Sequence, residues 1–251
     1  MDLEKYKYFN LIIKDSVIHI EINRPEKRNS FNPRLVYELC EIWDFIEENQ
    51  KLSVGIIRSV SDSFFSSGAD LKELIPLLRG EISAEDKYSR KLLKENLLMK
   101  FYRKDKVYQK PIIGVASGYC LAGGFELLLS CDFKLLDKNS TVGFPETKIG
   151  LIPAGGGVSR ISDTTTRSSA LEILINSEKI DINKLLYFGI INEITNKKNQ
   201  NDILDSYIKK IINSNDGAVK LLMQNIDQLQ SSNLSDKYKL EEKLLKKLLD
   251  E

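Results

Sequence analysis

The alternation of apolar and polar residues along the first third of the chain predicts a hairpin followed by a helix. Two short runs of β-branched residues, 7–13 and 16–22, are separated by two polar residues, which is typical of paired strands. A helix is expected to begin at Asn32, because Asn suits the N-cap and the following Pro33 suits the first helical position. Apolar residues then recur at helical spacing as far as Ile46.

The middle of the chain alternates strand-like and helical segments. Such alternation favours βα units on a mainly parallel sheet, and therefore an α/β fold class. The expected strands are 54–59, 111–117 and 131–137, and the expected helices are 83–108 and 125–130.

The chain from about residue 167 is expected to be helical, apart from a last strand in GIINEI at 189–194. The final helix carries a stripe of leucines on one face. A stripe of this kind must cover an apolar surface, either on the same subunit or on a neighbour. Its members are Leu240, Leu244, Leu245, Leu248 and Leu249.

Composition excludes several classes of protein. The 37 basic and 36 acidic residues leave a formal charge of +1, so neither a nucleic-acid partner nor a membrane partner is expected. No apolar run approaches the roughly 20 residues that cross a bilayer. The start of the chain has no secretory signal pattern, and the three cysteines form no CxxC motif, so a cytoplasmic location is expected.

The single histidine limits the possible chemistry. His19 alternates with Ile18, Ile20 and Ile22 and is therefore expected on the strand face that points away from the core. A Ser-His-Asp triad and a two-histidine metal site are then excluded, and no metal is expected. Acid–base work falls mainly to carboxylates, tyrosines and lysines.

One basic stretch has two interpretations. Residues 84–110 hold nine Lys or Arg and four Asp or Glu, so 9 − 4 gives a local charge of +5. This stretch is either a solvated helix face or a surface that steers an anionic ligand.

Two carboxylates stand out because glycines and apolar residues surround them. Glu126 lies in LAGGFELLLS and Glu146 lies in VGFPETKIGL. Glycines allow a backbone to approach a ligand closely, and an acid amid apolar residues is costly unless it serves a purpose. The window 110–157 is therefore predicted to form a catalytic pocket.

Three segments in this order resemble the crotonase superfamily of enoyl-CoA hydratases and isomerases. They are FFSSGADL (64–71), CLAGGFELLLSCD (120–132) and VGFPETKIGLIPAGGG (142–157). The resemblance covers roughly residues 6–195. It implies a crotonase-like ββα spiral core over 1–195 and a C-terminal helical region over 196–251. It also implies a homotrimer or hexamer.

The resemblance implies a hydratase acting on an acyl thioester. The N–H groups of Ala69 and Gly123 match the family's oxyanion hole, which stabilises an enolate oxygen. Glu126 matches the acid that orients and activates water, and Glu146 matches the acid that transfers a proton at Cα. Coenzyme A is part of the substrate, and no separate cofactor is expected.

Further substrate contacts follow from the same resemblance. Arg24, Lys27 and Arg28 are expected at the nucleotide end of coenzyme A, where cations suit phosphates. Phe144 stands where the family often has a polar residue, so an apolar wall near the acyl chain is expected. Ser67, Gly68, Asp70 and Leu71 complete the expected substrate contacts. Cys120 has no histidine to activate it and is expected to pack in the core.

Two other functions remain open from the sequence. An enoyl-CoA delta-isomerase would need mainly Glu146, and a crotonase-like protein without activity would bind a partner or RNA instead. The thioester carrier is either coenzyme A or the pantetheine of a carrier protein.

Overall fold

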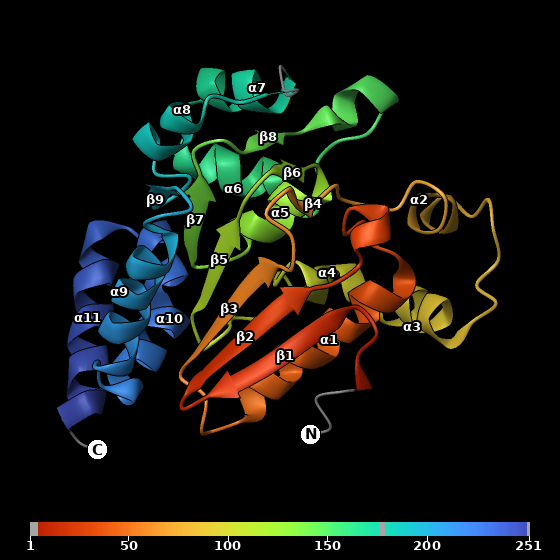
Figure 1. Ribbon diagram of the computed structural model, residues 1–251. Helices are drawn as coiled ribbons and strands as arrows, with labels where there is room; N and C mark the ends of the chain where they lie inside the picture. The colour runs from red at the N-terminus through yellow and green to blue at the C-terminus, as the bar shows by residue number, and fades with distance from the viewer. Residues whose placement is uncertain (1–4, 176–178, 250–251) are drawn as a thin grey trace.

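The computed structural model describes residues 5–175 and 179–249 and has two sheets (Figure 1). The larger sheet has the strand order β1-β2-β3-β5-β7-β9, in which only the β1–β2 pair is antiparallel. The α/β fold class is confirmed. These strands are β1 (Phe9–Lys14), β2 (Val17–Ile22), β3 (Val54–Ser59), β5 (Ile112–Ala116), β7 (Phe133–Asp137) and β9 (Glu193–Thr195).

A second sheet of three short parallel strands lies beside the first and was not predicted strand by strand. It comprises β4 (Phe64–Ser66), β6 (Tyr119–Leu121) and β8 (Thr141–Gly143) in that order. The chain therefore leaves a long strand, enters a short one and then turns into a helix, three times in succession. This repetition is the expected ββα arrangement, and it brings 64–71, 120–132 and 142–157 side by side.

The helices pack on both faces of the larger sheet. Their bounds are α1 (Pro33–Glu48), α2 (Leu74–Leu78), α3 (Lys87–Glu95), α4 (Leu97–Phe101), α5 (Gly123–Leu129), α6 (Gly157–Thr164), α7 (Arg167–Ile175), α8 (Ile182–Tyr187), α9 (Gln200–Ile212), α10 (Asp216–Ser231) and α11 (Leu234–Leu249). The 3-10 turns η2 (Pro25–Lys27) and η3 (Pro145–Ile149) lie in the connections between these elements. The predicted start of α1 is confirmed, because the Asn32 side chain accepts a hydrogen bond from the Leu35 N–H at 3.0 Å.

The prediction of one helix over 83–108 is wrong. Helix α3 begins after Asp86, whose carboxylate accepts hydrogen bonds from the N–H groups of Tyr88 and Ser89. It ends at Asn96, which takes the left-handed conformation that Asn tolerates better than most residues. The chain then starts the separate helix α4, and both helices turn apolar side chains, Leu92 and Phe101 among them, into the core. The last strand is also shorter than predicted, since it starts at Glu193 rather than 189.

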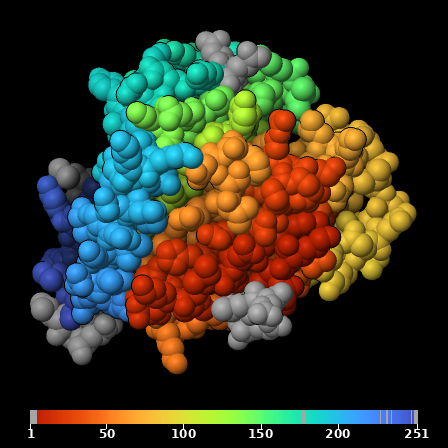
Figure 2. All heavy atoms as spheres, viewed as in Figure 1, coloured from red at the N-terminus to blue at the C-terminus, as the bar shows by residue number. Residues whose placement is uncertain are grey.

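The core has two parts, one on each face of the larger sheet. Between the sheet and α1, residues such as Ile20 and Trp43 are almost fully buried. On the other face, Leu204 and Ile211 of α9 pack against Val54 and other strand residues. Helices α9, α10 and α11 gather at one side of the molecule (Figure 1), and the space-filling view shows α9 directly beside the first hairpin (Figure 2).

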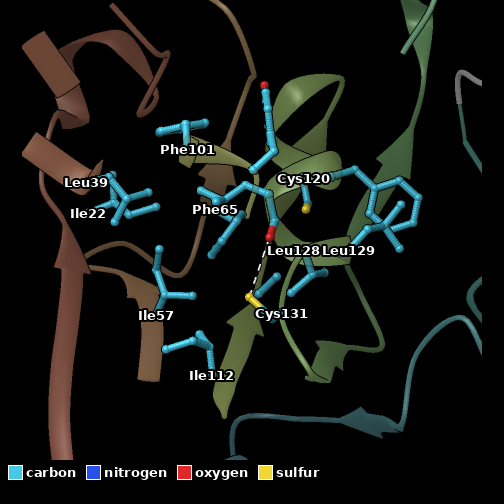
Figure 3. Packing of buried hydrophobic residues seen from close by; sticks show 14 of the residues in the cluster. Ile22, Leu39, Ile57, Phe65, Phe101, Ile112, Cys120, Leu128, Leu129 and Cys131 are labelled. Atoms are coloured by element: carbon cyan, nitrogen blue, oxygen red, sulfur yellow. Dashed lines mark hydrogen bonds between the residues drawn. The ribbon is translucent and has the colours of Figure 1, made fainter. Parts of the chain in front are cut away.

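One prediction about a side chain is confirmed in part and another in full. His19 is half-buried on the face opposite Ile18 and Ile20, but this face does not point away from the core, because Val17 of the same strand packs there with α9 in the second apolar cluster. Cys120 and Cys131 are buried in the apolar cluster drawn in Figure 3, and Cys131 Sγ lies 3.5 Å from the Leu127 carbonyl oxygen. Burial raises the pKa of the Cys120 thiol, which makes it a core residue rather than a nucleophile.

The C-terminal leucine stripe is only partly covered. Leu240, Leu244 and Leu248 are half-buried, Leu245 is exposed, and the side chain of Leu249 lies outside those described. The division at residue 195 stays a prediction. In the described part of the chain, no helix is long and apolar enough to cross a membrane.

Candidate active site

A cavity of about 560 Å³ opens between α2, α4, the start of α5 and the segment from η3 to α6. Both predicted acids, Glu126 and Glu146, line it, and so do the predicted oxyanion residues Ala69 and Gly123. The rest of the wall is mainly apolar. It includes Leu71, Leu78, Met99, Ile149 and Ile152, all of which are partly solvent-exposed at the rim.

The two predicted oxyanion residues carry free N–H groups at this cavity. Gly123 is the first residue of α5, so its N–H has no partner within the helix. Within residues 5–175 and 179–249, no hydrogen bond uses the N–H of Ala69 or Gly123. The two loops lie in contact, because a Cβ on Gly68 would stand 2.8 Å from the Gly123 nitrogen. Two unpaired donors therefore border one space.

Glu126 follows Gly123 by one turn of α5 and is only 4% exposed. Its Oε1 accepts a hydrogen bond from the Gly157 N–H at 2.9 Å. Burial raises the pKa of Glu126, while the N–H groups of Gly157 and Gly155 oppose that rise. The backbone of 155–157 thus holds this carboxylate at the cavity wall and favours its ionised form.

Glu146 lies in η3, lines the same cavity and has a different environment. It is 8% exposed, and its Oε2 is buried without a hydrogen-bond partner among the described residues. Burial, with a contribution from Glu126, raises the pKa of Glu146 to about 7. A carboxyl group in this state can hold or release a proton near neutral pH.

The structure adds Tyr102, which sequence reasoning missed. This residue is 6% exposed, follows α4 and lines the same cavity. It was hidden in the basic stretch 84–110, which was interpreted as one charged helix. The adjacent aromatic pair Phe101-Tyr102 was the available signal, since aromatic residues inside a charged run need an apolar surface to cover.

Arg24 and Asp70 are placed differently from the expectation that both contact substrate. Arg24 is 2% exposed, and its guanidinium donates to Asp70 Oδ2 at 2.8 Å and Glu73 Oε1 at 2.7 Å. Asp70 is buried in this pair and does not line the cavity. Because both ion-pair partners occupy the guanidinium, Arg24 is corrected to a structural residue that fixes the 64–71 loop.

The other predicted contacts divide into three groups. Ser67 and Leu71 line the cavity. Lys27 and Arg28 are exposed and lie outside its wall. Gly68 is buried behind Ala69, where it contacts Gly123.

Phe144 corrects the prediction of an apolar wall at that position. Its ring is fully buried and packs on Phe125 with centroids 4.9 Å apart. Phe144 lies behind the cavity rather than in its wall. The apolar wall is instead formed by residues of α2 and of 149–152.

The +5 stretch at 84–110 does not form one basic surface. Arg103 is buried against Asp132, with a 2.7 Å ion pair. Lys110 is buried and donates to the Ile46 carbonyl oxygen, and Lys100 pairs with Asp44. Much of its charge therefore has local partners. Within the described ranges, no group of three or more His, Cys, Asp or Glu could hold a metal ion.

Comparisons with known proteins point to one family. The family model described as "Enoyl-CoA hydratase/isomerase" matches residues 12–251. The chain is 26% identical over 234 residues to "Probable enoyl-CoA hydratase 2, mitochondrial" of Arabidopsis thaliana, covering 93% of this chain and 75% of that protein. It is 26% identical over 209 residues to "Short-chain-enoyl-CoA hydratase" of Clostridium acetobutylicum, covering 83% of this chain and 77% of that protein.

A solved structure confirms the predicted crotonase fold. The enoyl-CoA hydratase from Bacillus anthracis superposes with a TM-score of 0.85 at 22% identity, over 98% of this chain and 92% of that one.

Proposed function

The chain belongs to the enoyl-CoA hydratase/isomerase family, and from that premise we propose that it adds water across the trans-2 double bond of an acyl-CoA thioester. The observation that carries the proposal is the pair of buried carboxylates facing one cavity. Glu146 Oε2 lacks a partner, and Glu126 is held in place by the Gly157 N–H. A water molecule between them satisfies the unpaired oxygen.

The two acids have unequal environments that suit unequal roles. Backbone N–H groups favour the ionised form of Glu126, so this carboxylate accepts a proton from the water. Glu146 is protonated in a substantial fraction of molecules near neutral pH and delivers a proton to Cα. The water oxygen bonds to Cβ, the double bond becomes an enolate, and that enolate is protonated at Cα.

The N–H groups of Ala69 and Gly123 serve the thioester oxygen. As water adds at Cβ, negative charge moves to this oxygen, and two donors already fixed in a cavity with a mainly apolar wall stabilise it there. Loss of one such donor typically costs about 10²–10³ in rate. Both N–H groups lack a hydrogen-bond partner within the described residues, which supports this assignment.

The substrate carries an apolar acyl chain. The part of the cavity wall formed by α2 and residues 149–152 is aliphatic. It therefore has no carboxylate that could bind a cationic end of the acyl chain. Burial of apolar chain against such a wall is favourable at about 0.8 kcal/mol per CH₂. Coenzyme A belongs to the substrate, and we propose no further cofactor.

The assembly and location are also proposals. Exposed apolar side chains on the last two helices, including Leu222, Ile226, Tyr238 and Leu245, support association into a homotrimer or hexamer. Light scattering after size-exclusion chromatography measures this mass directly, and a monomer at micromolar concentration contradicts it. The cytoplasmic location stays a prediction.

The test is the loss of enoyl absorbance when purified protein is mixed with a trans-2-enoyl-CoA. The alternative, double-bond isomerisation, needs one acid, and the unpaired Glu146 is the observation that favours it. Two results together would identify an isomerase: the parent protein shows negligible hydration, and 3-enoyl isomerisation persists in Glu126→Gln.

A further inference from the structure

The side chain of Tyr102 is fixed at the active-site cavity by its surroundings. Its ring packs edge-on against Phe101, with centroids 4.8 Å apart. Its carbonyl oxygen accepts a hydrogen bond from Arg160 Nη2 at 2.8 Å. Arg160 also donates to the Gly155 carbonyl oxygen, so one guanidinium joins Tyr102 to the segment that holds Glu126.

The phenol lies beside the oxyanion donor Gly123 and the acid Glu126. Its Oη stands 2.5 Å from the point where a Cβ on Gly123 would be. Its Cε2 and Cζ stand 2.6 and 2.7 Å from the corresponding point at Gly155, and Glu126 Oε2 is 2.7 Å from that same point. Tyr102 is therefore at the reacting centre rather than at the rim.

The hydroxyl has no protein partner. Among the hydrogen bonds of residues 5–175 and 179–249, none involves Tyr102 Oη. Its oxygen is not one of the fully buried atoms without a partner, so the hydroxyl is open to the cavity and can donate a hydrogen bond to a group bound there. Glu146, which lines the same cavity, differs in that its Oε2 is fully buried without a partner among the described residues.

The oxygen exchanged at Cβ is the group that needs this donor. The thioester oxygen already has the N–H groups of Ala69 and Gly123, whereas Glu126 accepts a proton from the water that adds at Cβ and gives that oxygen no hydrogen bond to accept. The phenol ring and Glu126 Oε2 lie at the same point beside Gly155, so the hydroxyl belongs to the part of the cavity where Glu126 holds the water.

We propose that Tyr102 is a third catalytic residue whose hydroxyl donates a hydrogen bond to the oxygen exchanged at Cβ. This inference rests on the proposed hydration. As Glu126 takes a proton from the water, that oxygen gains negative charge, and a fixed neutral donor stabilises it. In the reverse direction, the same donor stabilises the departing hydroxide. Tyr102 keeps its proton throughout.

The environment keeps the phenol protonated. Burial raises its pKa well above the usual value, and Glu126 and Glu146 raise it further. Tyr102 therefore acts as a donor at every pH at which the protein is assayed.

The test compares Tyr102→Phe with the parent in three reactions: hydration of a trans-2-enoyl-CoA, dehydration of the 3-hydroxyacyl-CoA, and deuterium exchange at Cα of a saturated acyl-CoA. The first two exchange an oxygen at Cβ and the third does not. We expect kcat to fall about 10–100-fold in hydration and dehydration, with exchange within about twofold of the parent. Because Oη has no protein partner, the melting temperature should not fall.

Tyr108→Phe is the matched control. Tyr108 is also buried, but its hydroxyl bonds to Asp105 at 2.9 Å and lies outside the cavity. We expect its hydration rate within about twofold of the parent. Unchanged hydration in Tyr102→Phe overturns the inference, as does an equal loss in all three reactions, which would assign the phenol to the enolate oxygen. A parent protein that does not hydrate at all defeats the proposed function instead.

Discussion

The Glu126 carboxylate and the Gly157 N–H, 31 residues apart in the chain, are joined by a 2.9 Å hydrogen bond at the wall of the active-site cavity. One residue belongs to α5 and the other begins α6. The bond fixes one of the two proposed catalytic acids to the glycine segment 155–157, which leaves no room for side chains. A Cβ on Gly157 would stand 3.1 Å from Glu126 Oε1 and 2.8 Å from Pro153.

Gly155→Ala is predicted to displace the acid without unfolding the protein. The new Cβ would stand 2.7 Å from Glu126 Oε2 and 2.6 Å from Tyr102 Cε2, so both groups must move. Displacement of a catalytic group by about 1 Å can cost roughly 10²-fold, and we expect hydration to fall about 10–100-fold. Gly80→Ala is the control for activity, because its Cβ meets no atom within 4 Å, and the backbone strain that Ala brings at φ +71° arises at a residue that does not line the cavity. Equal activity of the two variants would contradict this account of the glycine segment.

Arg24→Ala is predicted to lower stability rather than affinity for coenzyme A. Removing one partner of a buried ion pair leaves Asp70 uncompensated, which typically costs about 3–5 kcal/mol. Lys27→Ala is the matched control, since Lys27 is exposed nearby and its loss should stay within about 0.5 kcal/mol. Urea unfolding measures both. A stable Arg24→Ala protein with a raised KM would restore the role of a phosphate contact.

The sequence predicted the site better than the elements around it. Glu126 and Glu146 were found because acids amid glycines and apolar residues are physically unusual, and both line the cavity. The long strands were also found, since buried parallel strands read as continuous apolar runs. The strands β4, β6 and β8 were not identified, because three residues are too few to show a period.

Two kinds of error came from partners that are distant in the chain. Arg24 resembles a surface cation in sequence, and only the fold brings Asp70, 46 residues away, against it. The stretch 84–110 resembles one solvated helix, but Asn96 breaks it so that Leu97 and Phe101 reach the core. Tyr102 was missed for the same reason, since its proposed role in the active site depends on the fold placing Gly123 and Gly155 beside it.

Glu146 is predicted to make stability fall as the pH rises. Its pKa is about 7 in the folded protein and near the ordinary 4.5 when unfolded, so the folded state binds the proton more tightly. This contribution is fully present below pH 4.5, is lost between pH 4.5 and 7, and amounts to roughly 3 kcal/mol. Glu146→Gln removes it. Urea unfolding measures the free energy of unfolding of both proteins at pH 4.5 and pH 8. Between these two pH values the variant's stability relative to the parent should increase by about that amount. The same difference in stability at both pH values would contradict the raised pKa.

The value of kcat/KM is predicted to rise as the acyl chain of the substrate becomes longer. Each added CH₂ that reaches the apolar wall contributes about 0.8 kcal/mol, or roughly fourfold, so the parent should favour an eight-carbon over a four-carbon trans-2-enoyl-CoA. A chain ending in a trimethylammonium group should lose this gain. Ile152→Ala should reduce the preference, because Ile152 lines the cavity, whereas Ile13→Ala on β1 should not. Equal rates for all chain lengths would contradict the proposed apolar substrate.

The most direct measurement of the central claim is the hydration rate of the parent, Glu126→Gln and Glu146→Gln on one trans-2-enoyl-CoA. Each substitution keeps the shape of the side chain and removes its ability to exchange a proton. Positioned acids and bases contribute typically 10²–10⁴-fold, so we predict that kcat falls by about that factor in each variant. Circular dichroism establishes that both variants are folded. Hydration at the parent rate in either folded variant would contradict the two-acid mechanism.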